Sequence, residues 1–134
     1  MSPPPFDWSQ YFTLANELAK RPEESALRSA LSRAYYYVYH LALQRAQANG
    51  FTALTGEGKH QQLWRNFKGS PEPDCRKLGE IAGRLKEKRE RADYEDNYRR
   101  LADEIPQMLA DAQDFAARLR RLDPRHPNPT SVRR

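Results

Sequence analysis

The chain has 134 residues, of which 38% are hydrophobic and 31% charged, and its formal net charge is +5. This length suits one domain with a substantial core, and no apolar run approaches the ~20 residues that a membrane helix requires. Cys75 is the only cysteine, which excludes an internal disulfide or a cysteine-based zinc site and favours the reducing cytoplasm. The basic balance favours an anionic partner, of which nucleic acid is the commonest.

Good helix formers dominate the composition, whereas β-branched residues are scarce. Val38 and Val132 are the only valines, and Ile81 and Ile105 are the only isoleucines. No segment alternates between polar and apolar residues with a period of two. The sequence therefore predicts an all-α fold, namely an up-and-down helical bundle of four to five helices with a long central second helix.

Five segments repeat apolar residues at the i, i+3, i+4 spacing that is typical of amphipathic helices. Pro22 and Gly50 bracket the longest of them as start and stop signals. We expect helices over residues 8–20, 23–49, 59–67, 75–91 and 103–122. They form one bundle, residues 7–122, preceded by a proline-rich flexible arm, residues 1–6. Residues 123–134 are rich in proline and arginine and are predicted to be a disordered basic tail.

The region around the last two helices carries two further signals. Residues 92–102 lack a clear periodicity and are predicted to be an irregular connection. With Asp103 as N-cap, Pro106 falls in the first turn of the last helix, where its missing N–H leaves no hydrogen bond unmade. Gly79 and Gly83 lie four residues apart on the fourth helix, which indicates a close contact with another helix there.

The second helix carries the candidate catalytic residues, Arg33 and His40. They are seven residues apart, so they differ by about 20° around the helix axis and ~10 Å along it, and they lie on a face distinct from the apolar one. Histidine can take or give a proton near neutral pH, and a guanidinium can hold a phosphate. These are the two groups that metal-free cleavage of RNA requires. The alternative is that His40 hydrogen-bonds a neighbour and Arg33 pairs with an acid.

Tyr35, Tyr36, Tyr37 and Tyr39 point in most directions around the same helix. One side can face the core, but the others need a second surface, because exposed aromatic patches usually mark partners. The cluster favours a homodimer interface over stacking on RNA bases. In the second case Tyr36 and Tyr37 are the candidate substrate-binding residues.

Two other groups of side chains have both a functional and a structural interpretation. Arg84, Lys88 and Arg91 share one face of the fourth helix and could track phosphates, although interleaved glutamates equally fit a solvated charged face. His60 begins the third helix beside Trp64, where a capping or packing role is favoured over catalysis. The acidic pairs have no histidine at ligand spacing and no phosphate-binding glycine loop exists, so we predict neither a metal site nor a cofactor.

The run Ser32-Arg-Ala-Tyr-Tyr36, within the segment from Leu27 to His40, resembles the HEPN superfamily, as does Arg89-Glu-Arg-Ala-Asp-Tyr94. The likeness is to the small prokaryotic branch with a "SRAYYA" second helix and an "R-x-x-ADY" segment, and it covers about residues 7–122. It implies a helical bundle and usually a homodimer. For many members it also implies metal-independent endoribonuclease activity in toxin–antitoxin or anti-phage systems.

The resemblance also bears on individual residues. The family's catalytic signature is an arginine and a later histidine with four to six residues between them, and Arg33 and His40, with six residues between them, fit the long form. In most active members the signature lies in a later helix, at a position matching Arg89 to Tyr94, which contains no histidine here. The catalytic pair then has a different origin in this chain, or the chain is a non-catalytic or modified member. In some family systems a nucleotidyltransferase antitoxin modifies a tyrosine beside the signature, and Tyr94 is the nearest equivalent.

The leading hypothesis is a homodimeric HEPN-like toxin or phage-defence ribonuclease that acts on RNA near the dimer seam. His40 is its general base or acid and Arg33 its phosphate clamp. A second wall of the groove would consist of Arg89, Arg91, Asp93 and Tyr94. The alternatives are a non-catalytic HEPN subunit that binds a nucleotidyltransferase partner or a nucleotide, and a purely structural helical adaptor.

Overall fold

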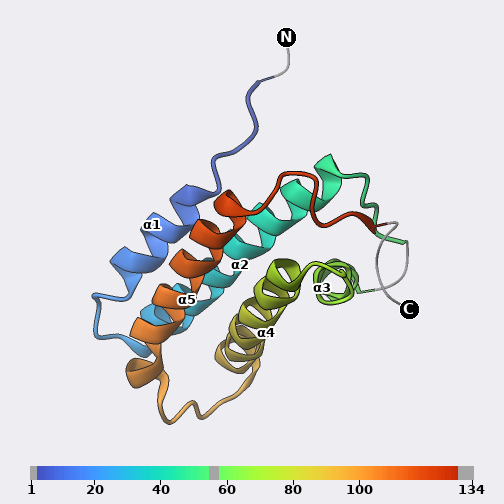
Figure 1. Cartoon of the computed structure of the whole chain (residues 1–134). Coiled ribbons are helices and arrows are strands. Elements are labelled where there is room, and N and C mark those ends of the chain that lie inside the picture. Colours follow the sequence, from blue (N-terminus) through green and yellow to red (C-terminus); the bar gives the residue numbers. More distant parts are fainter. Residues whose placement is uncertain (1–2, 55–57, 130–134) are drawn as a thin grey trace.

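The computed structural model describes residues 3–54 and 58–129, and all regular structure in these ranges is helical, as the composition predicts (Figure 1). The long second helix is central, since α2 contacts each of the other helices. In Figure 1, α3 is seen end-on beside α4, whereas α1 and α5 run along α2. The helices are α1 (Ser9–Leu18), α2 (Glu24–Ala48), α3 (Lys59–Lys68), α4 (Pro73–Tyr94) and α5 (Leu101–Arg121).

The C-terminal end of α2 shows why the predicted stop holds. Gly50 has a φ of +96°, a left-handed conformation that glycine adopts without a steric penalty. The chain reversal lets the Gly50 N–H donate to the Gln47 carbonyl and the Phe51 N–H to the Ala46 carbonyl, each at 3.0 Å. These two bonds form a Schellman motif, which satisfies carbonyls that the end of the helix would otherwise leave unpaired.

Two arginines of α2 hold the ends of other helices. Arg28 donates to the carbonyls of Ala92 (2.9 Å) and Glu95 (2.6 Å), at the C-terminal end of α4. Arg45 donates to the Leu119 carbonyl (2.8 Å) in the last turn of α5. A cation at a helix C-terminus also complements the helix dipole. The central helix therefore fixes the positions of α4 and α5 through charge as well as through its apolar face.

The segment that joins α4 to α5 differs from the prediction. α4 continues to Tyr94 and α5 begins at Leu101, with Arg100 rather than Asp103 as the N-cap. Pro106 is therefore the sixth residue of α5 and not part of its first turn, so the placement of this proline was wrong. It lies on the exposed side of α5, where water can satisfy the Ala102 carbonyl that has lost its N–H partner.

Gly79 and Gly83 lie where α3 ends against α4, at the close contact that their spacing predicts. A Cβ at Gly79 would come within 2.6 Å of Lys68 Cγ and 3.3 Å of the Lys68 backbone nitrogen. A Cβ at Gly83 would lie 3.4 Å from Lys68 Nζ. The absence of side chains at Gly79 and Gly83 thus leaves space along α4, which the aliphatic part of Lys68 fills.

Part of the predicted disordered tail is ordered. Residues 123–129 run from the end of α5 past the C-terminal end of α2 (Figure 1). The Asn49 amide donates to the Pro124 carbonyl at 3.0 Å, and Pro127 is fully buried. Apolar burial and these hydrogen bonds offset the chain entropy that the composition alone would leave unopposed. Residues 130–134 lie outside the described ranges.

Candidate functional site

Five side chains from three helices meet around Tyr36, and we call them the Tyr36 cluster: Arg33, Tyr36, His40, His60 and Arg89. The Cζ atoms of Arg33 and Arg89 each lie 5.7 Å from the centre of the Tyr36 ring. The ring centres of His60 and His40 lie 5.7 Å and 6.4 Å from it. α2 supplies Arg33, Tyr36 and His40, α3 supplies His60, and α4 supplies Arg89. The cluster therefore combines two imidazoles and two guanidiniums around one phenol.

The N-terminal helix region closes one side of the cluster. The Trp8 indole stacks on the His40 imidazole with ring centres 3.4 Å apart and planes 3° from parallel. The Arg33 guanidinium lies over the Tyr11 ring at 4.7 Å, a cation–π geometry. Both predicted catalytic residues are thus half-buried and held by aromatic faces, and no acidic side chain in the described ranges pairs with Arg33.

A buried chain of hydrogen bonds fixes the orientation of the His60 ring. The Trp64 indole N–H donates to the Tyr35 hydroxyl oxygen at 3.0 Å, which leaves the Tyr35 hydrogen to donate to His60 Nδ1 at 2.5 Å. An indole nitrogen is a donor only, so this order is the one that satisfies all three groups. The network therefore assigns the neutral tautomer of His60 with its proton on Nε2. Nε2 has no partner among the described residues and is not buried.

Both histidines of the cluster favour the neutral form. Burial, together with the nearby charges of Arg89, Lys86 and His40, lowers the pKa of His60 to about 4, whereas the charge of Glu90 opposes this shift. Burial also lowers the pKa of His40 below its usual value. His40 has no hydrogen-bond partner on either ring nitrogen among the described residues, and neither nitrogen is sealed from solvent. At neutral pH, His40 can accept a proton while His60 presents a fixed N–H donor.

Arg89 is the most buried charge of the cluster, with 9% of its surface exposed. It lies over the Tyr35 ring at 5.1 Å and pairs with Asp93 at 3.3 Å. Its Nε is buried without a hydrogen-bond partner. A buried guanidinium with incomplete pairing carries a desolvation cost that an additional anion would offset.

The remaining predicted substrate-binding residues lie elsewhere. Tyr37 packs on the other side of α2, where it stacks on Phe12 at 5.1 Å. The Arg91 guanidinium lies over Tyr98 at 4.1 Å and does not face Tyr36. Tyr94 is 79% exposed at the end of α4. Arg33, His40, Tyr36, Arg89 and, through its ion pair, Asp93 are therefore brought together, whereas Tyr37, Arg91 and Tyr94 are not.

His60 is the member of the cluster that sequence reasoning assigned to packing. It does pack, since its ring stacks on Tyr39 at 3.9 Å, but the centre of its ring also lies 5.7 Å from that of Tyr36. Residues 55–57, which precede the helix that carries His60, lie outside the described ranges. The sequence contained only one signal for this role, a histidine four residues before a tryptophan, so that both reach the same tyrosine.

The chain was compared with protein-family models, with curated proteins and with solved structures, and none of the comparisons gave a match. Within the described ranges, no three metal-ligating side chains gather, and no helix combines the length and apolarity needed to span a bilayer. The site is therefore interpreted from its own geometry.

Proposed function

We propose that this protein is a HEPN-like, metal-independent endoribonuclease and that the Tyr36 cluster is its active site. The observation that carries the proposal is the convergence of His40, His60, Arg33 and Arg89 on Tyr36. Two of these residues, Arg33 and His40, have the arginine–histidine spacing of the family's signature. Arg89 and Asp93 come from the segment that resembles the family's second motif.

The cluster supplies the groups that transesterification of RNA needs. His40 takes the proton of a ribose 2′-hydroxyl, whose oxygen then attacks the adjacent phosphorus. The bond from phosphorus to the 5′-oxygen breaks, giving a 2′,3′-cyclic phosphate and a 5′-hydroxyl. Protonated His40 or water returns a proton to the leaving oxygen. The reaction consumes no water and no redox equivalent at this step.

Arg33 and Arg89 stabilise the negative charge that develops on the phosphorane oxygens. His60 Nε2–H donates a further hydrogen bond to the same oxygens, because the Tyr35 hydroxyl holds its other nitrogen as an acceptor. The Tyr36 ring lies 5.7 Å from each guanidinium, so its phenol stands beside the groups that bind the phosphate. The cluster therefore combines one group for proton transfer, His40, with groups that stabilise the charge of the phosphorane.

The test is cleavage of a labelled RNA in the presence of excess EDTA. We expect the wild type to give products with 2′,3′-cyclic phosphate ends and no cleavage of a 2′-O-methyl RNA, which lacks the nucleophile. His40→Ala and Arg33→Ala should each lower the rate by about 10²-fold or more. Tyr37→Phe, on the opposite side of α2, is the matched control. Unchanged rates in both cluster variants would remove the Tyr36 cluster from the mechanism.

The resemblance also supports the biological setting of this proposal: a homodimeric toxin or phage-defence protein with a nucleotidyltransferase-type antitoxin as partner. Light scattering of the purified chain measures its mass in solution and so tests whether it is a dimer. Co-purification with the product of a neighbouring gene tests the antitoxin. A stable complex with a nucleotidyltransferase, together with a wild type that does not cleave RNA, would instead identify a non-catalytic subunit.

A further inference from the structure

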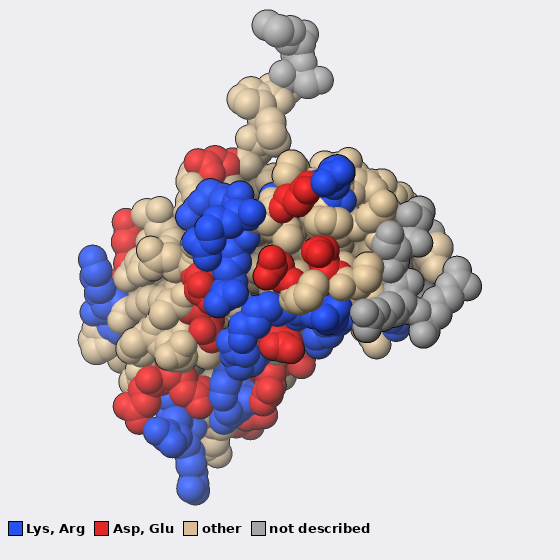
Figure 2. Space-filling model, viewed as in Figure 1, with Lys and Arg blue, Asp and Glu red and all other residues tan. Residues whose placement is uncertain are grey.

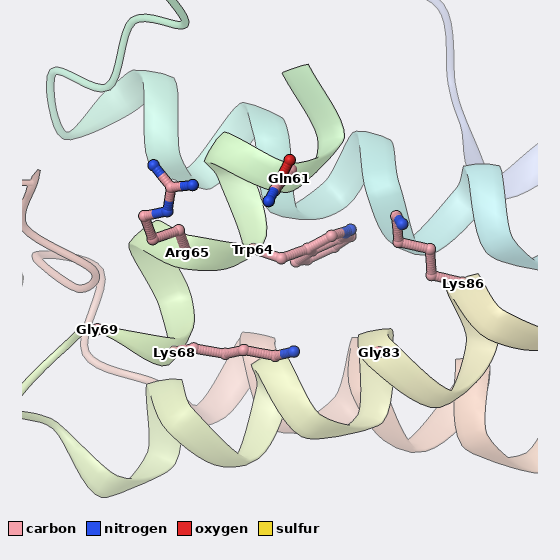
Figure 3. Close-up of a pocket in the computed structure, with 7 residues that line it drawn as sticks. All are labelled: Gln61, Trp64, Arg65, Lys68, Gly69, Gly83 and Lys86. Carbon is pink, nitrogen blue, oxygen red and sulfur yellow. The ribbon is translucent and has the colours of Figure 1, made fainter. Parts of the chain in front are cut away.

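A pocket of about 440 Å³ opens between α3 and α4, next to the Tyr36 cluster. It is lined by Gln61, Trp64, Arg65, Lys68, Gly69, Gly83 and Lys86. Figure 3 shows Lys68 extending beneath the Trp64 ring toward Gly83, and Lys86 standing beyond the end of that ring. Its volume is in the range of small-ligand sites, and every charged side chain in its lining is a cation.

The position of the Lys68 ammonium is determined by α4. Its stem fills the space left by the missing side chain of Gly79, and its Nζ lies where a Cβ at Gly83 would be in contact. A long cationic side chain held along a helix loses less entropy on binding an anion than one that moves freely. Lys68 is therefore partly preorganised for a ligand in this pocket.

The pocket cations are incompletely compensated. The side chains of Lys68 and Arg65 have neither an ion pair nor a hydrogen bond among the described residues. Lys86 pairs with Glu90 at 2.6 Å, but both side chains remain partly exposed. The excess of positive charge fits an anion, and ammonium groups act as point charges that suit a phosphate. The rest of the pocket is bounded by Trp64, Gly69 and Gly83 and has room for a sugar attached to the phosphate.

The pocket and the Tyr36 cluster are built in part from the same two helices, α3 and α4. Trp64 follows His60 by one turn of α3, and Lys86 precedes Arg89 by about one turn of α4. The charge of Lys86 contributes to the low pKa of His60, so the two sites share one electrostatic field. One helical turn rises ~5.4 Å, a separation that neighbouring nucleotides of a single strand can span.

We infer that the α3/α4 pocket is a second phosphate subsite, which binds the phosphodiester next to the one at the Tyr36 cluster. The inference rests on the proposed function for the identity of the strand as RNA. Lys68 and Lys86 hold the phosphate from two sides, and the ribose lies against the Trp64 wall. The subsite binds the strand without taking part in bond cleavage.

The test measures binding of a fluorescent single-stranded 2′-O-methyl RNA, which cannot be cleaved by this route, over a range of salt concentrations. Each phosphate neutralised on a single strand contributes about −0.7 to the slope of log affinity against log salt concentration. Lys68→Met keeps the stem over Gly79 but removes the charge, so it should make the slope less negative by about 0.7 and weaken binding about tenfold. Lys86→Met should act in the same direction. Lys77→Met, on α4 but outside the pocket, is the matched control.

If Lys68 and Lys86 grip the same phosphate, the double variant should change the slope by about 0.7 in total and not by twice that value. Slopes equal to the wild type in both single variants would overturn the subsite, as would a wild type that does not bind the RNA at all. The cleavage assay of the cluster variants is independent of this result. A wild type that binds with the expected slopes but does not cleave would overturn the proposed function and retain the subsite.

Discussion

The basic residues on the two sides of α4 differ in how completely acidic side chains compensate them. Along the seam with α5, Arg84 lies 3.7 Å from Asp111 and Lys88 lies 3.1 Å from Glu104. Figure 2 shows this band of Lys and Arg over α4 and α5 with Asp and Glu interspersed. Toward α2 and α3, by contrast, Arg33 and Lys68 have no acidic partner among the described residues, and Arg89 is buried with an unpaired Nε.

This difference separates the structural charges from the candidate functional ones. A paired surface charge is compensated within the fold and has no need of a ligand. A buried or preorganised cation without full pairing lowers the stability of the empty protein and gains most when an anion arrives. Net charge alone, at +5, cannot distinguish the two cases. The predictions below test whether the distinction holds.

The largest expected effect is at Arg89. Arg89→Met keeps much of the packing over Tyr35 but removes the guanidinium, so we expect RNA cleavage to fall by about 10²- to 10³-fold. Arg84→Met makes the same change on the seam and should leave cleavage within about twofold of the wild type. Single-turnover rates in EDTA measure both. Equal losses in the two variants would show that the two sides of α4 do not differ.

The next effect concerns the buried hydrogen-bond chain. Tyr35→Phe removes the hydroxyl and leaves the Trp64 N–H and His60 Nδ1 without partners, so we expect the free energy of unfolding to fall by about 1–3 kcal/mol. The exposed Tyr94→Phe should change it by less than about 0.5 kcal/mol. Urea denaturation at pH 7 gives both values. A Tyr35→Phe protein as stable as the wild type would contradict the assigned network.

The pH dependence of stability follows from His60. Its folded-state pKa of about 4 is below the ordinary value of 6.5, so between these values the unfolded chain binds the proton more readily. This contribution is therefore complete above pH 6.5 and is lost as the pH falls toward 4. Because His60 is only half-buried, we expect a loss of about 1–2 kcal/mol from this residue.

The measurement is urea denaturation of the wild type and of His60→Gln at pH 7 and pH 4.5. The variant cannot titrate at this position, so its stability should fall less over the interval than that of the wild type. Carboxylates titrate similarly in the two proteins and cancel in the difference. Parallel pH profiles would mean that His60 is not held neutral.

The smallest effects should come from the seam. Lys88→Ala removes one partner of Glu104 at a partly exposed site, so the free energy of unfolding should fall by less than about 1 kcal/mol. The Tyr98 hydroxyl still donates to Glu104, which limits the loss. Thermal melts of the wild type and of Lys88→Ala at low and high salt measure this loss of stability. The difference in stability between the two proteins should shrink at high salt. A loss above about 2 kcal/mol would contradict this expectation, because it would mean that the pair of Lys88 and Glu104 contributes strongly to stability.

Local signals were sufficient for most of the fold. The composition and the apolar spacing predicted an all-helical chain, and Gly50 ends α2 as its position predicts. The local signals gave wrong predictions where the structure depends on contacts between residues distant in the sequence. Pro106 was assigned to a first turn because Asp103 suits an N-cap, but packing of Leu101 in the core starts α5 three residues earlier than that cap would. The tail beyond Asp123 was expected to be disordered because it is rich in proline and arginine. The residue that anchors it, Arg45, lies far away in the sequence, so no local pattern reveals the contact.

The candidate site was predicted in part. Arg33, Tyr36 and His40 share a helix, so helical geometry alone places them on one face. That His60 and Arg89 join them depends on how α3 and α4 cross α2, which no local pattern encodes. The same periodicity that joined Arg33 to His40 left Tyr37 ambiguous, and the structure turns it toward Phe12.

The sequence by itself determined the helices, the central place of α2 and the arginine–histidine face, because these depend on residue type and on a 3.6-residue repeat. Only the tertiary structure decided which charges are paired and which are not. Pairing depends on contacts between residues distant in the chain, such as Lys88 with Glu104 on the seam. The tertiary structure leaves Lys68 and Arg33 without an acidic partner among the described residues. Other basic side chains of the same chemistry, such as Lys88, have one.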